Sequence, residues 1–436
     1  MRSIRKAAKD YLESYSPSDR STFVLDGRSA FWYGICTGLG LPLVGVVGRK
    51  LGMNADMLAL LMSAQFLGLL LNLWLGHLAR CGDLVAYVFW PGFLARASLA
   101  LVALVASPWA FLAVMAFYFV VSNLGGPAYS AIMRLNYSDR NRGRAMGHIR
   151  VMLQSVSAAC SLAAGFFLQA WPLGFRILFP IAAAAGVTSS LIFRRVKPLR
   201  RSSENEASGA VLGAAPGSVQ GGAPNQAGFR DSLALLARDR RFLVFMAIIF
   251  IVGFPDKMLI SLEPIRLVDE LGVGYGAAGL VLGAVPLAAA VLGYVLCSRL
   301  AGKIDPFLLL AATTILLASR QLGFALATSP AHLFPGVFLG GISNAGWDLL
   351  PLFAVILFTD EERLGLYMGL YFTLIGVRGI IGPAVGTWLY QSVGLSISSI
   401  YALSAYIEAA GAVLLLVFRA VWKGPSHPRF SGPSKA

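Results

Sequence analysis

Six ionisable residues stand inside apolar stretches of the sequence that are long enough to cross a membrane. They are Arg96, Asp256, Lys257, Asp348, Arg378 and Glu408. An ionised side chain in a bilayer costs about 2.5–3.5 kcal/mol on insertion scales, so each of these groups needs a partner, a water-filled space or a function. In membrane proteins such residues mark solute pathways and proton relays. They are therefore the first candidates for the chemistry of this chain.

Asp348 and Arg378 form the first candidate site. Asn344 stands about one helical turn before Asp348 and Gly341 two turns before it, so a stripe of polar and small residues runs along one helix face. Arg378 lies near the middle of the next apolar stretch, within reach of Asp348. A lasting Asp348–Arg378 pair would be structural. A pair that opens when Asp348 is protonated, or when an anionic substrate binds Arg378, would couple transport to a gradient.

Asp256 and Lys257 form a second candidate site, directly after Pro255. The proline removes a helix hydrogen bond and kinks the chain there. Neighbouring residues on a helix do not face each other, so we expect these two side chains not to pair, with one of them facing the interior. Packing is the alternative for this cluster. Glu263 and Arg266, three residues apart, are expected to form an exposed pair of little energetic value.

Neutral polar residues in the N-terminal part of the chain are weaker candidates for binding a substrate. They are Gln65, Asn123 and Gln154. Most such groups in membrane proteins join helices by hydrogen bonds.

Motifs of soluble catalysis are missing from the sequence. Neither a G-x-x-x-x-G-K-[ST] loop nor an H-E-x-x-H helix occurs, and the four cysteines and four histidines are scattered. We therefore predict no catalytic residues, no metal site and no cofactor.

The candidate residues are held by apolar segments of about 20 residues, the length of a helix that crosses a bilayer. Hydrophobic residues make up 57% of the 436 residues and charged residues only 13%, and the mean hydropathy is +0.70. This composition excludes a soluble single-core enzyme and predicts an all-α polytopic membrane protein. Twelve spans are predicted near residues 29–48, 56–76, 84–106, 109–131, 151–170, 174–193, 241–262, 276–298, 306–326, 332–356, 366–389 and 397–420.

The distribution of basic residues predicts the orientation of these spans. Of the 36 Lys and Arg residues, 28 fall on the side that carries both termini and only four in the loops on the other side. By the positive-inside rule the termini are cytoplasmic, and the protein lies in the cell membrane, or in the inner membrane of a bacterium. This bias explains the net charge of +15 without any nucleic acid partner.

The chain divides into two halves of six spans that resemble each other. The predicted parts are an amphipathic cytoplasmic segment 1–28, a bundle 29–195, a cytoplasmic linker with an interfacial helix 196–240, a second bundle 241–420 and a cytoplasmic tail 421–436. A shift of 222 places Asp83 over Asp305 and Gly143 over Gly365, each at the same point of its half. Equal spacing of like elements indicates an internal duplication, which is typical of transporters.

The stretch after the fourth span carries a recognisable motif. Residues Asp139, Arg140, Asn141, Arg142, Gly143, Arg144, Ala145, Met146 and Gly147 resemble the "ERGRAxG" stretch of the major facilitator superfamily. The family's loop after the second helix, G-x-L-A-D-R-x-G-R, is matched less well: Gly76, Leu78 and Ala79 are in register, but Arg80 replaces the aspartate and Asp83 follows late. The resemblance assigns these two loops to a gate at the cytoplasmic side.

This resemblance extends over residues 29–420 and implies both a fold and a function. In that fold helices 1, 4, 7 and 10 line a central cavity and helices 3, 6, 9 and 12 lie outside, so Arg96 and Glu408 are expected to have structural roles. The implied function is a secondary active transporter that moves a small solute by alternating access, with proton coupling as one mechanism. It would work as a monomer in contact with membrane lipids. A non-transporting assembly factor or sensor is the alternative, and a membrane enzyme is a distant third.

Overall fold

The computed structural model describes residues 17–75, 83–198, 239–301, 303–359 and 363–422, without the side chains of residues 17, 18, 73–75, 139, 140, 142 and 365. The described chain is helical and contains no strand. Twelve of its helical segments are long and apolar enough to cross a membrane, from Asp19–Lys50 to Ile397–Val421. The predicted all-α fold with twelve spans is confirmed.

The N-terminal half contains six spans built from ten helical segments. They are α2 (Pro17–Gly40), η1 (Leu41–Leu43), α3 (Val44–Lys50), α4 (Ala55–Leu75), α6 (Leu84–Ser98), η2 (Leu99–Leu104), α7 (Pro108–Ser122), α8 (Gly126–Asn136), α9 (Asp139–Ala170) and α10 (Phe175–Phe193), with the short turn η3 (Pro172–Gly174) before α10. The first helix begins at Pro17, twelve residues ahead of the predicted start at 29. Residues 1–16 of the predicted amphipathic segment 1–28 lie outside the described residues, and the rest of that segment belongs to α2.

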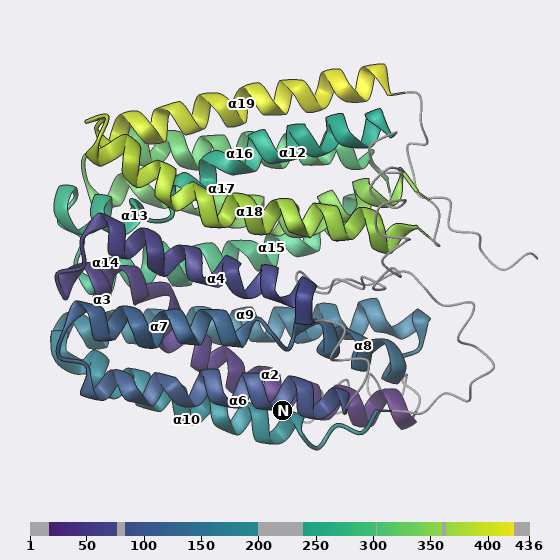
Figure 1. Cartoon of the computed structure of the whole chain (residues 1–436), viewed down its shortest axis with the longest axis horizontal. Coiled ribbons are helices and arrows are strands. Elements are labelled where there is room, and N and C mark those ends of the chain that lie inside the picture. Colours follow the sequence, from purple (N-terminus) through teal and green to yellow (C-terminus); the bar gives the residue numbers. More distant parts are fainter. Residues whose placement is uncertain (1–16, 76–82, 199–238, 302, 360–362, 423–436) are drawn as a thin grey trace, which may run out of the picture.

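The C-terminal half repeats this plan with six further spans. They are built from α12 (Arg240–Leu259), α13 (Glu263–Ile265), η5 (Arg266–Glu270), α14 (Tyr275–Ala278), η6 (Gly279–Ala284), α15 (Val285–Leu300), α16 (Pro306–Leu326), η7 (Pro330–His332), α17 (Leu333–Ile356), α18 (Leu364–Gln391) and α19 (Ile397–Val421). Figure 1 shows the two halves side by side, α2 to α10 below and α12 to α19 above. Most of the predicted linker 196–240 lies outside the described residues.

Equivalent aspartates start equivalent helices in the two halves. Asp83 Oδ1 accepts a hydrogen bond of 2.9 Å from the Val85 amide and caps α6. Asp305 Oδ1 accepts one of 2.9 Å from the Phe307 amide and caps α16. A carboxylate at this position satisfies a backbone donor that has no partner within the helix. The two caps thus have the same role at the positions that the sequence repeat aligns.

The bundle has two ends, which we name by the segments found there. The linker end carries the first residue of α2, the last residues of α10 and α19, and the first residue of α12. The far end carries the connections at 51–54, 105–107, 171–174, 260–274, 327–332 and 392–396. In Figure 1 the far end is on the left and the linker end on the right.

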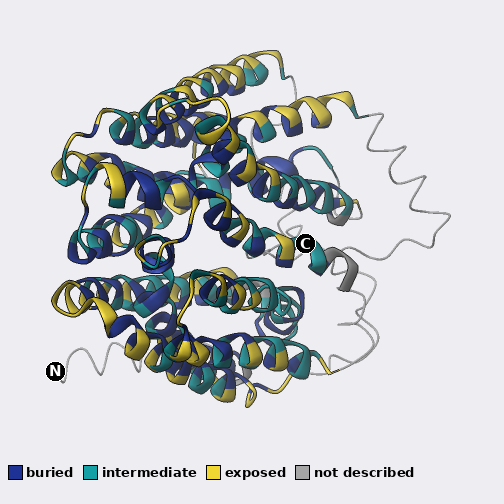
Figure 2. Ribbon diagram, turned by 60° about the vertical axis from the view of Figure 1, so that its left-hand side comes forward, coloured by how far each residue is buried: buried dark blue, intermediate teal, exposed yellow. Residues whose placement is uncertain are grey.

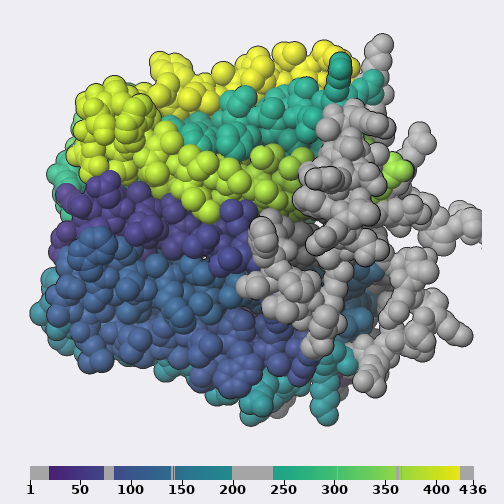
Figure 3. Space-filling view, in the orientation of Figure 1, coloured from purple at the N-terminus to yellow at the C-terminus, as the bar shows by residue number. Residues whose placement is uncertain are grey.

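Among the described residues, the buried apolar cluster that includes side chains of both halves lies toward the far end. One cluster of buried residues contains side chains of both halves, among them Val47 and Leu168 from the first and Ile265 and Tyr275 from the second. At the linker end the buried residues form two separate clusters, one in each half. In Figure 3 the surface of α4 meets that of α18 toward the far end. The described parts of the halves therefore share a buried core toward the far end and have separate buried cores at the linker end.

Small residues allow the closest approach between the halves. Gly165 of α9 lies against η6, and a Cβ atom built on it would stand 2.8 Å from the Tyr275 carbonyl oxygen and 2.9 Å from the Gly279 Cα. Ser161, one turn earlier, donates a hydrogen bond of 3.3 Å to the Gly279 carbonyl. Only a residue without a side chain fits at this contact.

The outer surface of the bundle is apolar. Large exposed side chains such as Leu104, Trp109 and Tyr406 point outward, and Figure 2 shows exposed positions spread over the outside of both halves. A soluble protein rarely exposes so much contiguous apolar surface, whereas a bilayer covers it.

Candidate functional site

Asp256 and Lys257 form an ion pair on α12. Lys257 Nζ donates to Asp256 Oδ2 at 2.6 Å, and each side chain keeps about a quarter of its surface exposed, 24% for Asp256 and 22% for Lys257. The prediction that these neighbours do not pair is wrong. It considered only the directions of the Cβ atoms, but the four methylene groups of lysine let its ammonium bend back to the adjacent carboxylate.

Lys257 also lies at the boundary with the other half. Its ammonium is 5.6 Å from the ring centroid of Phe66 on α4. A Cβ atom on Gly382 of α18 would be only 2.6 Å from the Lys257 Cβ. The Asp256–Lys257 pair is therefore held where α4, α12 and α18 meet.

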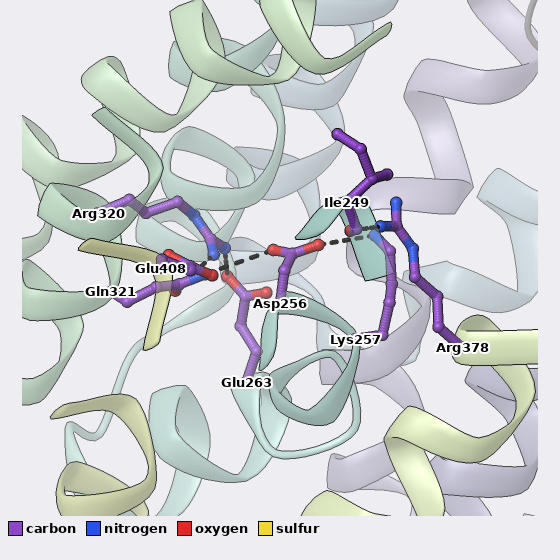
Figure 4. A network of polar contacts seen from close by, with 8 residues as sticks. All are labelled: Ile249, Asp256, Lys257, Glu263, Arg320, Gln321, Arg378 and Glu408. Atoms are coloured by element: carbon purple, nitrogen blue, oxygen red, sulfur yellow. Dashed lines mark hydrogen bonds and ion pairs between the residues drawn. The ribbon is translucent and has the colours of Figure 1, made fainter. Parts of the chain in front are cut away.

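A second ion pair extends this cluster away from the centre. Arg320 Nη2 of α16 donates to Glu263 Oε1 at 2.6 Å, and Arg320 Nη1 donates to the Gln321 side-chain oxygen at 3.1 Å. Gln321 Nε2 is 3.4 Å from Asp256 Oδ1 and 3.4 Å from Glu408 Oε1. Figure 4 shows these side chains as one connected network from α12, α13, α16 and α19.

Sequence reasoning missed the role of α16 in this network. Arg320 and Gln321 stand together in the apolar stretch 306–326, and a polar pair at that depth is a signal that could have been used. The prediction of an exposed ion pair between Glu263 and Arg266 is also wrong. Glu263 binds Arg320, while Arg266 is buried, pairs with Glu270 and donates to the Ala327 carbonyl at 2.8 Å.

Asp348 has a partner that the sequence did not indicate. The hydroxyl of Tyr294 on α15 donates to Asp348 Oδ2 at 2.5 Å. Arg150 of α9, in the other half, interacts with both of these residues. Asn344, one turn from Asp348, is exposed, and Asp348 itself is partly exposed.

Arg378 does not bind Asp348 in this structure. Its Nη1 donates to the backbone carbonyl of Ile249 at 3.0 Å, and its guanidinium lies 5.8 Å from the ring of Trp347. The side chain is buried, and its Nε makes no hydrogen bond within the described part of the chain. Arg378 therefore joins α18 to α12 here and leaves the Asp348 carboxylate to Tyr294.

Asn123 and Arg96, two polar residues of the N-terminal half, join helices. Asn123 Nδ2 donates to the carbonyls of Phe119 at 2.8 Å and Gln65 at 3.1 Å, which ties α7 to α4. Gln154 is half-buried on α9. Arg96 donates to the Ser190 hydroxyl of α10 at 2.7 Å, in keeping with its expected structural role.

The predicted cytoplasmic gate motifs are described only in part. Gly76 lies outside the described residues, as do the side chains of Asp139, Arg140 and Arg142. Asp83 caps α6. Gly143 and Arg144 are exposed in the first two turns of α9.

At the far end an ion pair links the two halves. Asp269 Oδ2 of η5 accepts hydrogen bonds from Arg49 Nε at 2.8 Å and Nη2 at 2.5 Å. Arg49 stands at the end of α3 and also donates to the Met53 carbonyl at 2.7 Å. The pair spans the closed end of the bundle.

Comparison with known proteins decides the family. The model of the Major Facilitator Superfamily matches residues 29–254 and 245–436. The chain belongs to this superfamily. The predictions of family and fold are confirmed, and the matches support a secondary transporter over the assembly-factor or sensor alternative. The family is one of transporters and is generally non-enzymatic.

Individual relatives agree with this assignment. The chain is 29% identical over 150 residues to the "Multidrug resistance protein MdtH" of Aeromonas hydrophila and, to the same extent, to that of Aeromonas salmonicida. The match covers 34% of this chain and 37% of each relative, so the chain spans well under half of their length in these matches.

Solved structures show the same fold at low identity. A crystal structure of a mutant of the nucleoside transporter NupG matches with a TM-score of 0.69 at 13% identity, over 91% of this chain and 99% of that one. An auto-inhibited POT family peptide transporter matches with a TM-score of 0.66 at 14% identity, over 94% of this chain and 98% of that one. At these identities the likeness concerns the fold alone.

Proposed function

We propose that this superfamily member is a proton-coupled secondary transporter that exports small organic cations by alternating access. The observation that carries the proposal is the unequal packing of the halves: one apolar cluster joins them at the far end, and separate clusters lie at the linker end. In alternating access, one end of the transporter is closed while the two halves can separate at the other end. The proposal makes the protein a carrier and not an enzyme.

The orientation follows from the basic residues. The helix ends and connections at the linker end hold most of the lysines and arginines, so we place that end and both termini in the cytoplasm. The described conformation is then closed toward the outside, in the cell membrane. The paired halves of a single chain suffice for this cycle, and a monomer is the proposed working unit.

The substrate class follows from the groups that remain available between the halves. Asp348 is partly exposed beside the exposed Asn344, and Asp256 keeps 24% of its side chain exposed. Arg378 is buried and donates to a backbone carbonyl, so it is poorly placed to hold an anion. A carboxylate next to an aromatic side chain, here Asp348 beside Tyr294, favours an organic cation. The name of the matched relatives, a multidrug resistance protein, agrees with this class.

Coupling to protons would use the same carboxylates. Asp348 can hold either a proton or a cation, and competition between the two exchanges one for the other. A tyrosine donor and a nearby arginine stabilise its ionised form when the cation has left. The Asp256–Lys257 pair offers a second carboxylate whose partner is released when a cation binds.

Proteoliposomes with an imposed pH gradient test this function. The wild type should move a fluorescent cation such as ethidium against its gradient, and Asp348→Asn should abolish this driven movement while downhill exchange remains. Asp56→Asn makes the same chemical change at an exposed residue of α4 and should behave like the wild type. Full driven transport by Asp348→Asn would refute its coupling role, and no flux by the wild type would refute cation transport.

A further inference from the structure

Glu408 of α19 is a carboxyl group without a matching charge. Its side chain is completely buried, and Oε2 makes no hydrogen bond within the described part of the chain. Oε1 has a single, long contact of 3.4 Å with Gln321 Nε2. An ionised carboxylate in such surroundings is strongly disfavoured, because neither water nor a cation compensates for its charge.

The charged groups around Glu408 are already engaged with one another. On α12, Lys257 binds Asp256, and on α16, Arg320 binds Glu263. Arg378 of α18 lies on the opposite side of Lys257 from Glu408, as Figure 4 shows, and donates to a backbone carbonyl. The set thus contains three carboxyl groups, those of Asp256, Glu263 and Glu408, beside two described cations, Lys257 and Arg320. One proton on Glu408 brings the net charge of the set to zero.

The side chain of Gln321 connects Glu408 with the centre of the protein. Its Nε2 lies 3.4 Å from both Glu408 Oε1 and Asp256 Oδ1, while its oxygen accepts from Arg320. A change of charge at Asp256 therefore acts on Glu408 through one shared amide group. Asp256 is partly exposed on α12, whereas Glu408 is sealed from solvent.

We propose that Glu408 is a second proton-binding site of this protein, coupled to Asp256 through Gln321. The inference rests on the proposed transport function and assigns a part in proton coupling to α19, a peripheral helix. In the described conformation the carboxyl group holds the proton. When an organic cation binds Asp256, Lys257 loses its partner, and its ammonium then compensates an ionised Glu408. The O–H bond of Glu408 breaks, and water that reaches the site past Asp256 accepts the proton, so one cation enters as one proton leaves.

Infrared difference spectroscopy of the purified full-length protein tests the site without any transport assay. The spectrum of the wild type minus that of Glu408→Gln should show the carbonyl stretch of a buried carboxylic acid. This band should shift in D2O and be absent from Glu408→Gln. Glu270→Gln is the matched control, because Glu270 is partly exposed and pairs with Arg266. An unchanged band in Glu408→Gln would overturn the proposal.

Proton counting in proteoliposomes tests the coupling. Glu408→Gln should import one proton less per exported cation than the wild type, with the same downhill exchange. Gln321→Leu, which keeps Glu408 and its infrared band, should lower driven transport several-fold, and it serves as the second variant if Glu408→Gln does not fold. Wild-type stoichiometry in both variants would overturn the proposal. Absence of proton-driven flux in the wild type would instead refute the proposed function, and the infrared result would still decide whether Glu408 is protonated.

Discussion

Replacing Gly165 by leucine should open the far end of the bundle. Even a Cβ atom at this position would stand 2.8 Å from the Tyr275 carbonyl oxygen and 2.9 Å from the Gly279 Cα, both on the opposite half. Backbone atoms at these distances must move apart to admit a side chain. Overpacking of this kind costs about 1–3 kcal/mol. The cost applies only when the far end is closed, so it shifts the ratio of open to closed conformers by about 5- to 150-fold.

A buried cysteine at the closed end reports this shift. Ile265 lies on α13, which contacts α3 of the other half, and is 2% exposed. In a variant that lacks the four native cysteines, Ile265→Cys should react with a membrane-impermeant maleimide at least fivefold faster when Gly165→Leu is added. Gly147→Leu is the control, since it makes the same change on the same helix where nothing lies within 4 Å. An unchanged rate with Gly165→Leu, or an equal rise with Gly147→Leu, would refute this reasoning.

Three further predictions concern the same architecture. Asp269→Asn removes the ion pair with Arg49, and exposed ion pairs stabilise by about 0.2–1 kcal/mol. The labelling rate of Ile265→Cys should therefore rise by no more than about fivefold, and by less in high salt. Glu270→Gln removes an ion pair between two residues of the same half and should leave the labelling rate unchanged. Asp83→Ala should destabilise the protein by about 0.5–2 kcal/mol through loss of the α6 cap. Asp305→Ala should destabilise it by more, because Asp305 also binds Arg419 at 2.6 Å. Thermal unfolding measures both losses of stability, and variants as stable as the wild type would contradict the prediction. A reporter fused after residue 215 should be cytoplasmic and one near residue 172 should face outside; the opposite result for either would overturn the orientation.

The fold could be predicted from the sequence because it depends on coarse properties. Long apolar segments, turn signals between them and the bias of basic residues define twelve helices in two halves, and the repeat of Asp83 and Asp305 has a structural counterpart in two helix caps. The predicted start of the first span at residue 29 is too late, because the polar residues ahead of it belong to the same helix and two of them, Asp19 and Asp26, are buried. Asp26 accepts a hydrogen bond from Tyr129, and Asp19 from Ser138.

The partners of the charged residues could not be predicted in the same way. The choice of partner depends on which helix faces which, and on the reach of long side chains. Asp348 binds Tyr294, a residue that looks like one more aromatic group of an apolar span, and Arg378 binds a backbone carbonyl, which no sequence pattern marks. Arg320 and Glu263 come from different helices and meet only after the half has folded. Sequence identified most of the network's charged members but not their connections.

The most direct test of the account measures both ends of the protein at once. Spin labels on exposed residues of the two halves, Leu173 and Val393 at the far end and Arg195 and Lys303 near the linker end, give two distances in the same reconstituted protein. Addition of an organic cation together with a pH gradient should lengthen the far-end distance and shorten the linker-end distance, so that the two change in opposite directions. Two distances that stay fixed, or that change in the same direction, would contradict alternating access in this chain.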